Sequence, residues 1–212
     1  MDQRLVAVVD YGMGNLRSVS KAAEHMADAQ TRVIVTQDPQ VIHNADAVIF
    51  PGQGAARACM QALENTGMIE PIKRAAQEKP FLGICMGLQV LMSHSDENGG
   101  VDCLNIIPGK VTQFDLSSYP ELKMPHMGWN QIHQTQDHPL WHAIPQDSRF
   151  YYVHSYYVVP ENPSTLFGET THGQTFPAVL STHNLFAIQA HPEKSAEHGL
   201  QLFKNFLSWN GH

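Results

Sequence analysis

One cysteine in the sequence is placed as a catalytic nucleophile would be. Cys85 has a glycine two residues before it and another two residues after it, at the end of an apolar run. This spacing has the form of a nucleophile elbow, in which glycines let the backbone cross itself closely and push the side chain into a pocket. A small buried hydrophobic cysteine is the alternative, but the two glycines favour the nucleophile.

The residues around Cys85 predict a strand, a sharp turn and a helix. Phe81–Ile84 suit a buried parallel strand, and the apolar side chains from Leu88 to Met92 suit the buried side of a following helix. Cys85 would then lie at a helix N-terminus. Free backbone N–H groups and a partial positive charge at that position favour the thiolate and can bind a developing oxyanion.

A cysteine nucleophile needs a general base, and the base needs a group that orients it. The candidates are His191, at the end of the apolar run Ala187–Ala190, and Glu193 two residues further on. Pro192 keeps the backbone extended there, which returns the two side chains to the same face. The segment therefore predicts an imidazole–carboxylate pair, with an ordinary surface turn as the alternative. The order cysteine, histidine, glutamate differs from that of α/β-hydrolases, in which the acid precedes the histidine.

The first 95 residues alternate apolar β-branched runs with segments of helical periodicity. This alternation predicts an α/β fold with a parallel central sheet and helices on both faces, and ligands bind such sheets at the carboxyl ends of the strands. Gly52 and Cys85 both lie at predicted strand ends and should therefore be close. The predicted strands are Leu5–Asp10, Thr31–Thr36, Ala47–Phe50 and Phe81–Ile84. Four helices are predicted between these strands. The first has Asn15 as its N-cap, the second begins at Asp38-Pro39, the third begins near Ala55, and the fourth spans Met68–Glu78.

The second half is richer in strands, many of which should be antiparallel additions to the sheet. We expect the polar segment Ser95–Val101 to be a loop, and Ser195–Trp209 to be a closing amphipathic helix. The predicted strands are Gly109–Phe114, Met127–His133, Arg149–Val159, Leu166–Thr171, Thr175–Ser181 and Leu185–Ala190.

Composition limits the classes of function. A chain of 212 residues with 42% hydrophobic and 16% charged residues predicts a single domain spanning 1–212. The formal charge of −7 and the lack of a long basic run argue against nucleic acid or a membrane surface as partner, and no segment is long enough to span a membrane. Three cysteines without a CxxC indicate a reducing, cytoplasmic setting.

Cofactor motifs are weak or missing. Gly12 and Gly14 follow the first strand, but Arg17 replaces the third glycine of a dinucleotide-binding loop. The 13 histidines include no HxH or HExxH pattern. We therefore expect neither a metal nor an organic cofactor.

Taken together, these residues resemble the class I glutamine amidotransferases. Their glutaminase domains carry Gly-x-Cys-x-Gly-x-Gln, present here from Gly83 to Gln89, and a late His-Pro-Glu, present here from His191 to Glu193. Asp10–Val19, Pro51–Ala55 and Pro125–Asn130 are similar to segments of the glutaminase subunits of imidazole glycerol phosphate synthases. The resemblance runs from about Val8 to Ser195, and it implies a flavodoxin-like fold and one glutamine amidotransferase domain.

The resemblance implies a reaction and roles for residues. Cys85 would attack the side-chain amide carbon of glutamine while His191, oriented by Glu193, transfers the protons. Ammonia would leave, and water would hydrolyse the glutamyl thioester to glutamate. The backbone N–H groups of Met86 and Gln53 would bind the oxyanion.

Further residues match family positions that bind glutamine. Their alternatives, a helix-face glutamine and a half-buried strand, stay open at this stage. The matching residues are Gly52, Gln89, His154, Ser155 and Tyr156.

The resemblance also implies a partner. In this family ammonia passes directly to a cyclase subunit, a (β/α)8 barrel of histidine biosynthesis, within a heterodimer. Asn15, Trp129 and Lys194 match positions near that interface and the passage for ammonia. For Trp129, core packing is an equal alternative.

Two departures from the family pattern affect local packing: Ala190 stands where many relatives have an aromatic residue, and Asn105 ends a segment that is usually Gly-Leu-Gly. Three other functions remain as alternatives: a glutaminase that serves another synthase, a redox-sensing or chaperone-like protein that uses Cys85, and a non-catalytic regulatory subunit. Retention of Cys85, His191 and Glu193 together argues against the last.

Overall fold

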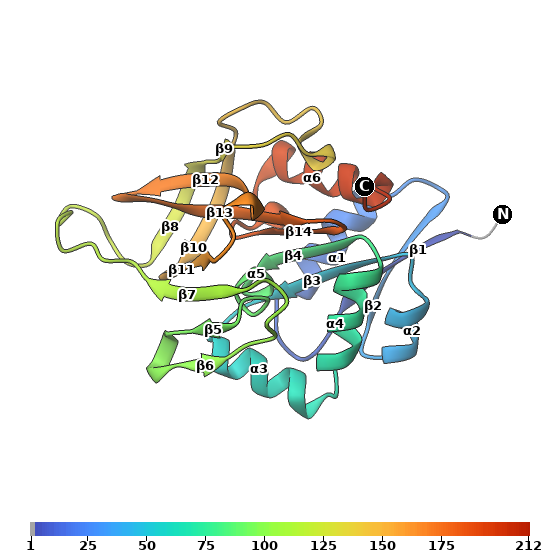
Figure 1. Cartoon of the computed structure of the whole chain (residues 1–212). Helices are drawn as coiled ribbons and strands as arrows, with labels where there is room; N and C mark the ends of the chain where they lie inside the picture. The colour runs from blue at the N-terminus through green and yellow to red at the C-terminus, as the bar shows by residue number, and fades with distance from the viewer. Residues whose placement is uncertain (1–2) are drawn as a thin grey trace.

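The computed structural model describes residues 3–212, and a mixed β-sheet forms its centre (Figure 1). Within these residues the sheet has eight strands in the order β2-β1-β3-β4-β14-β13-β12-β9. The strands from β2 to β14 in this order pair in parallel, and the pairings beyond β14 are antiparallel. The predicted α/β fold, with a parallel part followed by antiparallel strands from the second half of the chain, is confirmed.

The bounds of the elements are as follows. The strands of the central sheet are β1 Arg4–Val9, β2 Thr31–Thr36, β3 Ala47–Gly52, β4 Phe81–Cys85, β9 His133–Gln134, β12 Leu166–His172, β13 Gln174–Thr182 and β14 Leu185–Ile188. The other strands are β5 His94–Ser95, β6 Val101–Asp102, β7 Gly109–Gln113, β8 His126–Gln131, β10 Arg149–His154 and β11 Tyr156–Pro160. The α-helices are α1 Leu16–Met26, α2 Pro39–Asn44, α3 Ala56–Asn65, α4 Ile69–Glu78, α5 Met86–Gln89 and α6 Ala196–Ser208. The 3-10 turns are Glu97–Gly99, Pro139–Trp141, Pro163–Thr165 and Pro192–Lys194.

The helices cover both faces of the parallel strands. Helix α1 packs against α6 behind the sheet, and α2 packs against α4 in front of it (Figure 1). Because both faces are covered, β3 and β4 are buried along their whole length, which explains why they are continuous apolar runs rather than alternating ones.

Asn15 and Asp38 both stand at the helix N-caps that the sequence predicts, but only one of the two side chains caps its helix. Asp38 caps α2, since its carboxylate accepts from the Gln40 N–H and Pro39 occupies the first turn. Asn15 stands at the N-cap position of α1, but its side chain makes no capping hydrogen bond. The amide instead donates to Glu193 at 3.4 Å, so the predicted N-cap position of Asn15 is confirmed although its side chain does not cap the helix.

The last strand of the sheet, β14, enters beside β4 and runs parallel to it. Leu185 pairs with Phe81, and Ile188 pairs with Ile84. On the other side of β4, Gly52 of β3 pairs with Cys85, as predicted from the strand ends. Parallel neighbours end at the same edge of a sheet, so the segment after β14 continues next to Cys85.

Two of the predicted strands are broken where the chain changes sheets. Arg149–Val159 is interrupted at Ser155: β10 pairs with β8, whereas β11 pairs with β7 in a separate four-stranded sheet. Met127–His133 is likewise divided into β8 and β9, because β9 joins the central sheet at β12. The segment Ser95–Val101 is not only a loop, since its ends belong to the strand pair β5–β6.

The helix after Cys85 is shorter than predicted. Helix α5 ends at Gln89, although the next residues to Met92 are buried as expected. The carbonyl groups of Val90, Leu91 and Met92 accept hydrogen bonds from the backbone of residues 104–107. These three carbonyl groups cannot also accept the hydrogen bonds of a further helical turn. The bonds to residues 104–107 therefore end the helix.

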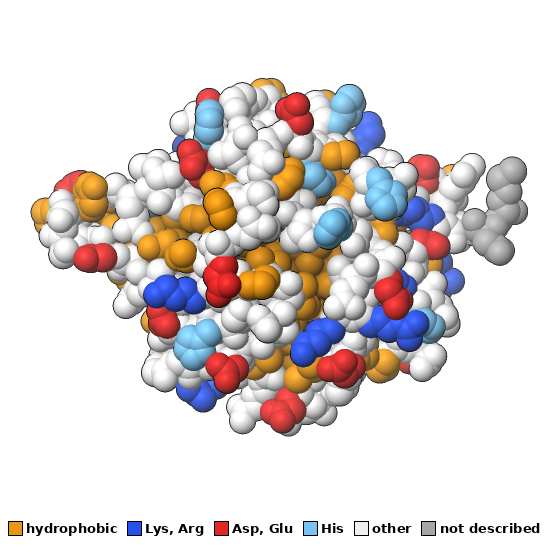
Figure 2. Space-filling view, in the orientation of Figure 1, with side chains coloured by type: hydrophobic (Ala, Val, Ile, Leu, Met, Phe, Trp, Pro, Cys, Tyr) orange, Lys and Arg blue, Asp and Glu red, His pale blue; other side chains and the backbone are white. Residues whose placement is uncertain are grey.

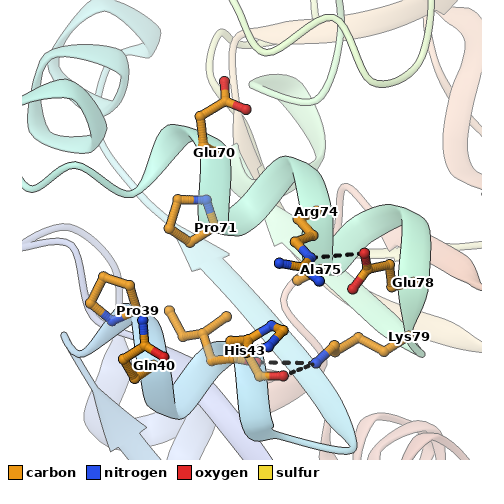
Figure 3. A pocket seen from close by; sticks show the side chains of 10 residues that line it. Pro39, Gln40, His43, Glu70, Pro71, Arg74, Ala75, Glu78 and Lys79 are labelled. Atoms are coloured by element: carbon orange, nitrogen blue, oxygen red, sulfur yellow. Dashed lines mark hydrogen bonds and ion pairs between the residues drawn. The ribbon is translucent and has the colours of Figure 1, made fainter.

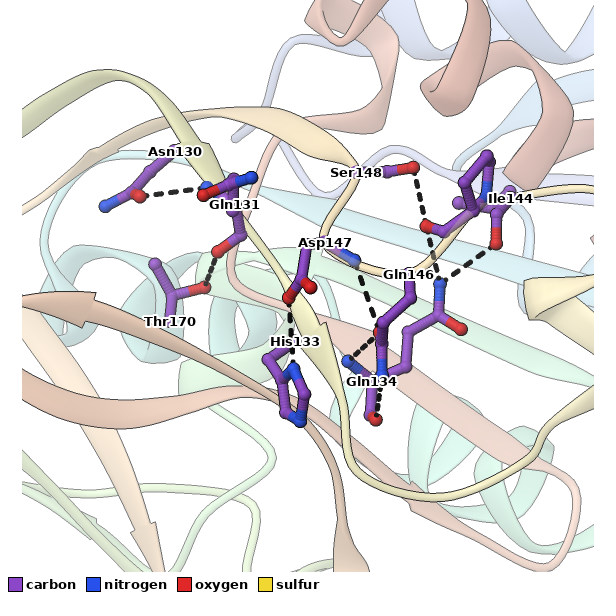
Figure 4. Close-up of polar contacts among 10 residues, drawn as sticks. Asn130, Gln131, His133, Gln134, Ile144, Gln146, Asp147, Ser148 and Thr170 are labelled. Atoms are coloured by element: carbon purple, nitrogen blue, oxygen red, sulfur yellow. Dashed lines mark hydrogen bonds and ion pairs between the residues drawn. The ribbon is translucent and has the colours of Figure 1, made fainter.

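Side-chain hydrogen bonds fix the end of the sheet at β9 (Figure 4). His133 bonds to Asp147 at 3.0 Å, and the Gln146 side chain accepts from the Gln134 N–H at 2.7 Å. In return, the Gln146 amide donates to the Gln134 carbonyl at 2.9 Å. These bonds hold the loop before β10 against the edge strand and leave little of that edge unpaired.

The face of the molecule drawn in Figure 2 has no large patch of a single charge sign. Acidic and basic side chains are interspersed there, and hydrophobic side chains are visible in the hollow at its centre. None of the helices within residues 3–212 combines the length and the apolar character needed to cross a membrane.

Helices α2 and α4 line a pocket of about 430 Å³ to which no cysteine, serine or threonine of the described residues contributes (Figure 3). Lys79, at the end of α4, donates to the carbonyl groups of His43 at 2.7 Å and Ala45 at 2.8 Å. These carbonyls lie at the C-terminus of α2, where a cation is favourable. We therefore assign Lys79 a structural role.

Replacing Lys79 by Met should lower the free energy of unfolding by about 1–2 kcal/mol, because charged hydrogen bonds to the end of α2 are lost. Urea denaturation of the purified chain measures this effect. The control is Lys73→Met, which removes a lysine of the same helix that makes only a 4.0 Å ion pair with Glu70. Equal stabilities of the two variants would contradict the role of Lys79.

Candidate active site

The predicted elbow at Cys85 is confirmed. Cys85 ends β4 with φ 56° and ψ −112°, a strained conformation for a residue other than glycine. A Cβ atom on Gly87 would collide with the Phe50 carbonyl oxygen, and one on Gly83 would lie 2.9 Å from the Gly87 carbonyl oxygen. Glycine is therefore required at both positions, and the crossing of β4 with α5 holds the cysteine in its strained turn.

The predicted pair of His191 and Glu193 is also present. His191 Nδ1 lies 2.8 Å from Glu193 Oε1, and the two side chains are 5% and 1% exposed. The local backbone differs from the expectation, because Pro192–Lys194 form a 3-10 turn instead of continuing extended. Within residues 3–212, His191 Nε2 has no hydrogen-bond partner and is free to act on Cys85 or on a ligand.

Electrostatics favour the protonated imidazole. Burial by itself lowers the pKa of His191, but the neighbouring Cys85 thiolate and the Glu193 carboxylate outweigh it and raise the pKa to about 10. At neutral pH His191 is therefore an imidazolium, which places a proton donor beside the sulfur of Cys85.

Cys85 and His191 open into a pocket of about 320 Å³, large enough for an amino acid. Of the residues singled out from the sequence, nine contribute to its wall, while Glu193 lies behind His191. Those nine residues are Gln53, Cys85, Met86, Gln89, His154, Ser155, Tyr156, His191 and Lys194.

The comparisons with known proteins agree with this geometry. The model of the family "Glutamine amidotransferase class-I" matches residues 7–209. The chain belongs to the class I glutamine amidotransferases. Among curated relatives, it is 67% identical to the imidazole glycerol phosphate synthase subunit HisH of Hydrogenovibrio crunogenus, over 99% of each chain. It is 54% identical to the subunit of the same name from Nitrosococcus oceani, over 97% of this chain and 98% of the relative.

Solved structures support the fold of this amidotransferase. The structure of PurLQS from Thermotoga maritima matches with a TM-score of 0.70 and covers 98% of both chains. Its sequence identity of 18% means that this likeness bears on the fold alone.

Gln89 of the amidotransferase is buried at the base of the pocket. Its side-chain amide donates to the Tyr156 carbonyl and to Gln189 Oε1, both at 3.0 Å. Nε2 is the donor in both of these bonds. The side-chain oxygen of Gln89 accepts no hydrogen bond from residues 3–212.

His154 forms part of the pocket wall, but both of its ring nitrogens are engaged within the protein. Nδ1 bonds to the Tyr156 carbonyl at 2.8 Å, and Nε2 bonds to His126 at 2.9 Å. Burial lowers the pKa of His154 to about 3, so the ring is neutral. The ring can shape the pocket and position Tyr156, but it has no nitrogen left for a ligand.

The loop over Cys85 brings Gln53 to the pocket. The Gln53 side chain is exposed, and the Gln53 carbonyl accepts from the Cys59 thiol at 3.3 Å. Burial raises the pKa of the Cys59 thiol to about 11, which keeps it a donor. Met86 is the first residue of α5, so its N–H has no acceptor within the helix.

Three residues near the site were not predicted. Glu97 is the only acidic side chain of the pocket wall, and it lay within a segment expected to be a loop. Gln189 approaches Cys85, and Tyr151 contacts Lys194. The position of Gln189 two residues before His191 was a usable signal, because strand residues two apart face the same way.

The proposed interface residues occupy one region of the surface. Trp129 is 45% exposed on β8, which rules out simple core packing. Its ring meets the Tyr151 ring edge-on at 6.2 Å, and the Lys194 ammonium lies 5.9 Å from the centre of the same ring. Asn15 is half-buried and reaches this region through Glu193, the neighbour of Lys194.

In the part of the chain that the structure describes, no three histidine, cysteine, aspartate or glutamate side chains are grouped as ligands for a metal ion.

The protonation of the histidines can be checked directly by ¹⁵N NMR titration. We expect His191 to be an imidazolium at pH 7 and to titrate near pH 10, whereas His126 and His154 stay neutral down to about pH 4 and pH 3. Glu193→Gln should lower the pKa of His191, because it removes a negative charge that stabilises the cation. Glu197→Gln makes the same chemical change on an exposed residue of α6 and should have no effect. A neutral His191 at pH 7 in the unmodified protein would contradict this electrostatic assignment.

Proposed function

We propose that the chain is a single glutaminase domain, the ammonia-producing subunit of an imidazole glycerol phosphate synthase. The observation that carries this proposal is 67% identity over 99% of both chains to a relative of that name, in a protein whose Cys85 and His191 share a pocket. The substrate is L-glutamine and the products are glutamate and ammonia. The three free thiols agree with a cytoplasmic location.

The reaction begins at Cys85. Its thiolate attacks the side-chain amide carbon of glutamine, and the C–N bond breaks as His191 gives its proton to the leaving nitrogen. Water then attacks the glutamyl thioester while His191 accepts a proton, and the C–S bond breaks to release glutamate. Glu193 holds the imidazole in the required tautomer and stabilises its cation.

The oxyanion of each tetrahedral intermediate forms beside the elbow. The Met86 N–H follows the nucleophile directly and is free of helical hydrogen bonding. The second donor is the Gln53 N–H, and Gly52 lets this loop approach closely, since a Cβ there would lie 2.8 Å from Met86 Cβ. Removal of one such donor typically lowers kcat about 10²-fold or more.

The charged groups of the amino acid are matched by the remaining wall of the pocket. The Glu97 carboxylate pairs with the α-ammonium group of glutamine, and the free side-chain oxygen of Gln89 can accept a hydrogen bond from the same group. Ser155 and the backbone next to Tyr156 contact the α-carboxylate. His154 contributes shape and holds the Tyr156 carbonyl.

The partner is a cyclase subunit that receives the ammonia in a heterodimer. The exposed Trp129 and Lys194 side chains contact the half-buried Tyr151 ring and form an aromatic and cationic surface next to His191 and Glu193. Aromatic residues are enriched in interfaces. Asn15 connects this surface to Glu193. Transfer across a sealed contact keeps ammonia unprotonated and therefore nucleophilic.

Glutamate release from glutamine tests the proposal. The purified chain is assayed alone and with the cyclase subunit and its ribonucleotide ligand. We expect release that depends on the partner and falls about 10³-fold or more in Cys85→Ala, since the covalent step is lost. The matched control Cys103→Ala removes a thiol outside the pocket and should retain activity. Release only with a different synthase would change the pathway, and no release with any synthase would overturn the proposal.

The role of Glu97 leads to a separate prediction. Glu97→Gln should raise KM for glutamine about tenfold with a smaller change in kcat, because the ion pair with the α-ammonium group is lost. The variant keeps an acceptor for the Ala56 N–H, which Glu97 binds at 2.7 Å at the start of α3. Glu64→Gln, at the exposed end of the same helix, is the control. An unchanged KM would exclude Glu97 from substrate binding.

A further inference from the structure

A buried glutamine contacts the proposed nucleophile and has no part in the mechanism above. Gln189 is 0% exposed and lies between β14 and His191. Its side-chain nitrogen is 3.8 Å from Cys85 Sγ, within hydrogen-bond distance of a sulfur acceptor. A buried amide donor without an acceptor is costly, and the acceptor that this amide finds is the sulfur of Cys85.

Neighbouring hydrogen bonds fix the direction of this amide. The Tyr156 carbonyl can only accept, so the Gln89 group bonded to it at 3.0 Å is the NH₂ group. The same NH₂ group lies 3.0 Å from Gln189, which must therefore present its oxygen to Gln89. The nitrogen of Gln189 is left facing Cys85 as a donor.

The acceptor that fixes Gln89 is itself held from the other side. Because the Tyr156 carbonyl accepts from His154 Nδ1, the other nitrogen of His154 is an acceptor for His126 Nδ1 at 2.9 Å. His126 Nε2 then accepts from the Asn130 amide at 3.1 Å. Asn130 cannot flip, since its nitrogen also donates to the Thr171 carbonyl. Its oxygen accepts from the Gln131 N–H (Figure 4).

The direction of these bonds persists at neutral pH. Burial lowers the pKa of His126 to about 4 and that of His154 to about 3, so neither ring gains the second proton that would reverse the order. Every donor in the series from Asn130 points toward the Tyr156 carbonyl, and this carbonyl orients Gln89.

The amide of Gln189 acts on the sulfur in addition to the His191 imidazolium, and helix α5 adds little to either. Helix α5 has only four residues, so its dipole is much weaker than that of the longer helix predicted from the sequence. Six titratable groups on the elements packed around the elbow face Cys85 or its pocket. These groups are Tyr11, Cys59, Glu97, His191, Glu193 and Lys194.

We propose that Gln189 is a further catalytic residue: its side-chain N–H donates to Cys85 Sγ and stabilises the thiolate before glutamine binds. The inference rests on the proposed function, in which Cys85 is the nucleophile. Gln89 contacts both the ligand pocket and Gln189, so the same amide that faces glutamine also sets the donor on the sulfur.

The test is the pH dependence of Cys85 alkylation by iodoacetamide in the full chain, followed peptide by peptide. Gln189→Glu keeps the length and an acceptor for Gln89 but replaces the donor by a carboxylate. Gln189→Met removes the donor without adding a charge, and covers the case in which a buried carboxylate prevents folding. We expect the midpoint to rise by about one pH unit in Gln189→Met and further in Gln189→Glu, because a hydrogen bond to a charged acceptor is lost.

Two controls separate the possible outcomes. Gln201→Glu makes the same change on α6 and should leave the midpoint where it is. Cys103, whose thiol pKa is raised to about 11 mainly by burial, is the slow internal reference. If Cys85 reacts no faster than Cys103 in the unmodified protein, both the proposed function and this inference are overturned. A fast Cys85 with an unmoved midpoint in folded Gln189 variants overturns the inference alone.

Discussion

The parallel pairing of β4 with β14 is the contact on which the rest of the site depends. It joins strands about 100 residues apart in the sequence and ends them at one edge, with Cys85 after the first and His191 after the second. No hairpin could do this, because antiparallel neighbours end at opposite edges. The antiparallel strands β13 and β12 extend the sheet only beyond β14, so the catalytic edge keeps the geometry of a parallel sheet.

Burial and charge act together at this edge. Water is largely excluded from His191 and Glu193, and a charged imidazole in such surroundings is stable only because carboxylate and thiolate both lie close to it. Burial lowers the pKa of His126 and His154, and no acidic side chain within residues 3–212 offsets this effect, so both rings stay neutral. The same residue type is thus a buried cation in one place and a neutral hydrogen-bonding group in the other.

The sequence was sufficient for features that depend on local pattern. Glycine spacing predicted the elbow at Cys85, apolar runs predicted the parallel strands, and a short polar segment after a strand predicted the His191–Glu193 pair. Features set by distant partners were missed. Helix α5 ends early because residues 104–107 bond to the carbonyls of the three residues that follow it. The strand predicted over Arg149–Val159 breaks because its two halves pair with different strands. The Glu97 side chain reaches the pocket from a segment that carries no sequence signal for this role, whereas the spacing of Gln189 from His191 was a signal that we did not use.

The crowding at the elbow affects how sequence variation in this protein should be interpreted. Gly52, Gly83 and Gly87 lie where three backbone segments meet, and each lacks room for even a methyl group. A survey of substitutions scored by growth would show these glycines to be as intolerant as Cys85, although none supplies a reacting atom. Substitutions of these glycines would fail because a side chain does not fit. A ranking of positions by mutational sensitivity would therefore not separate reacting residues from residues that must be small.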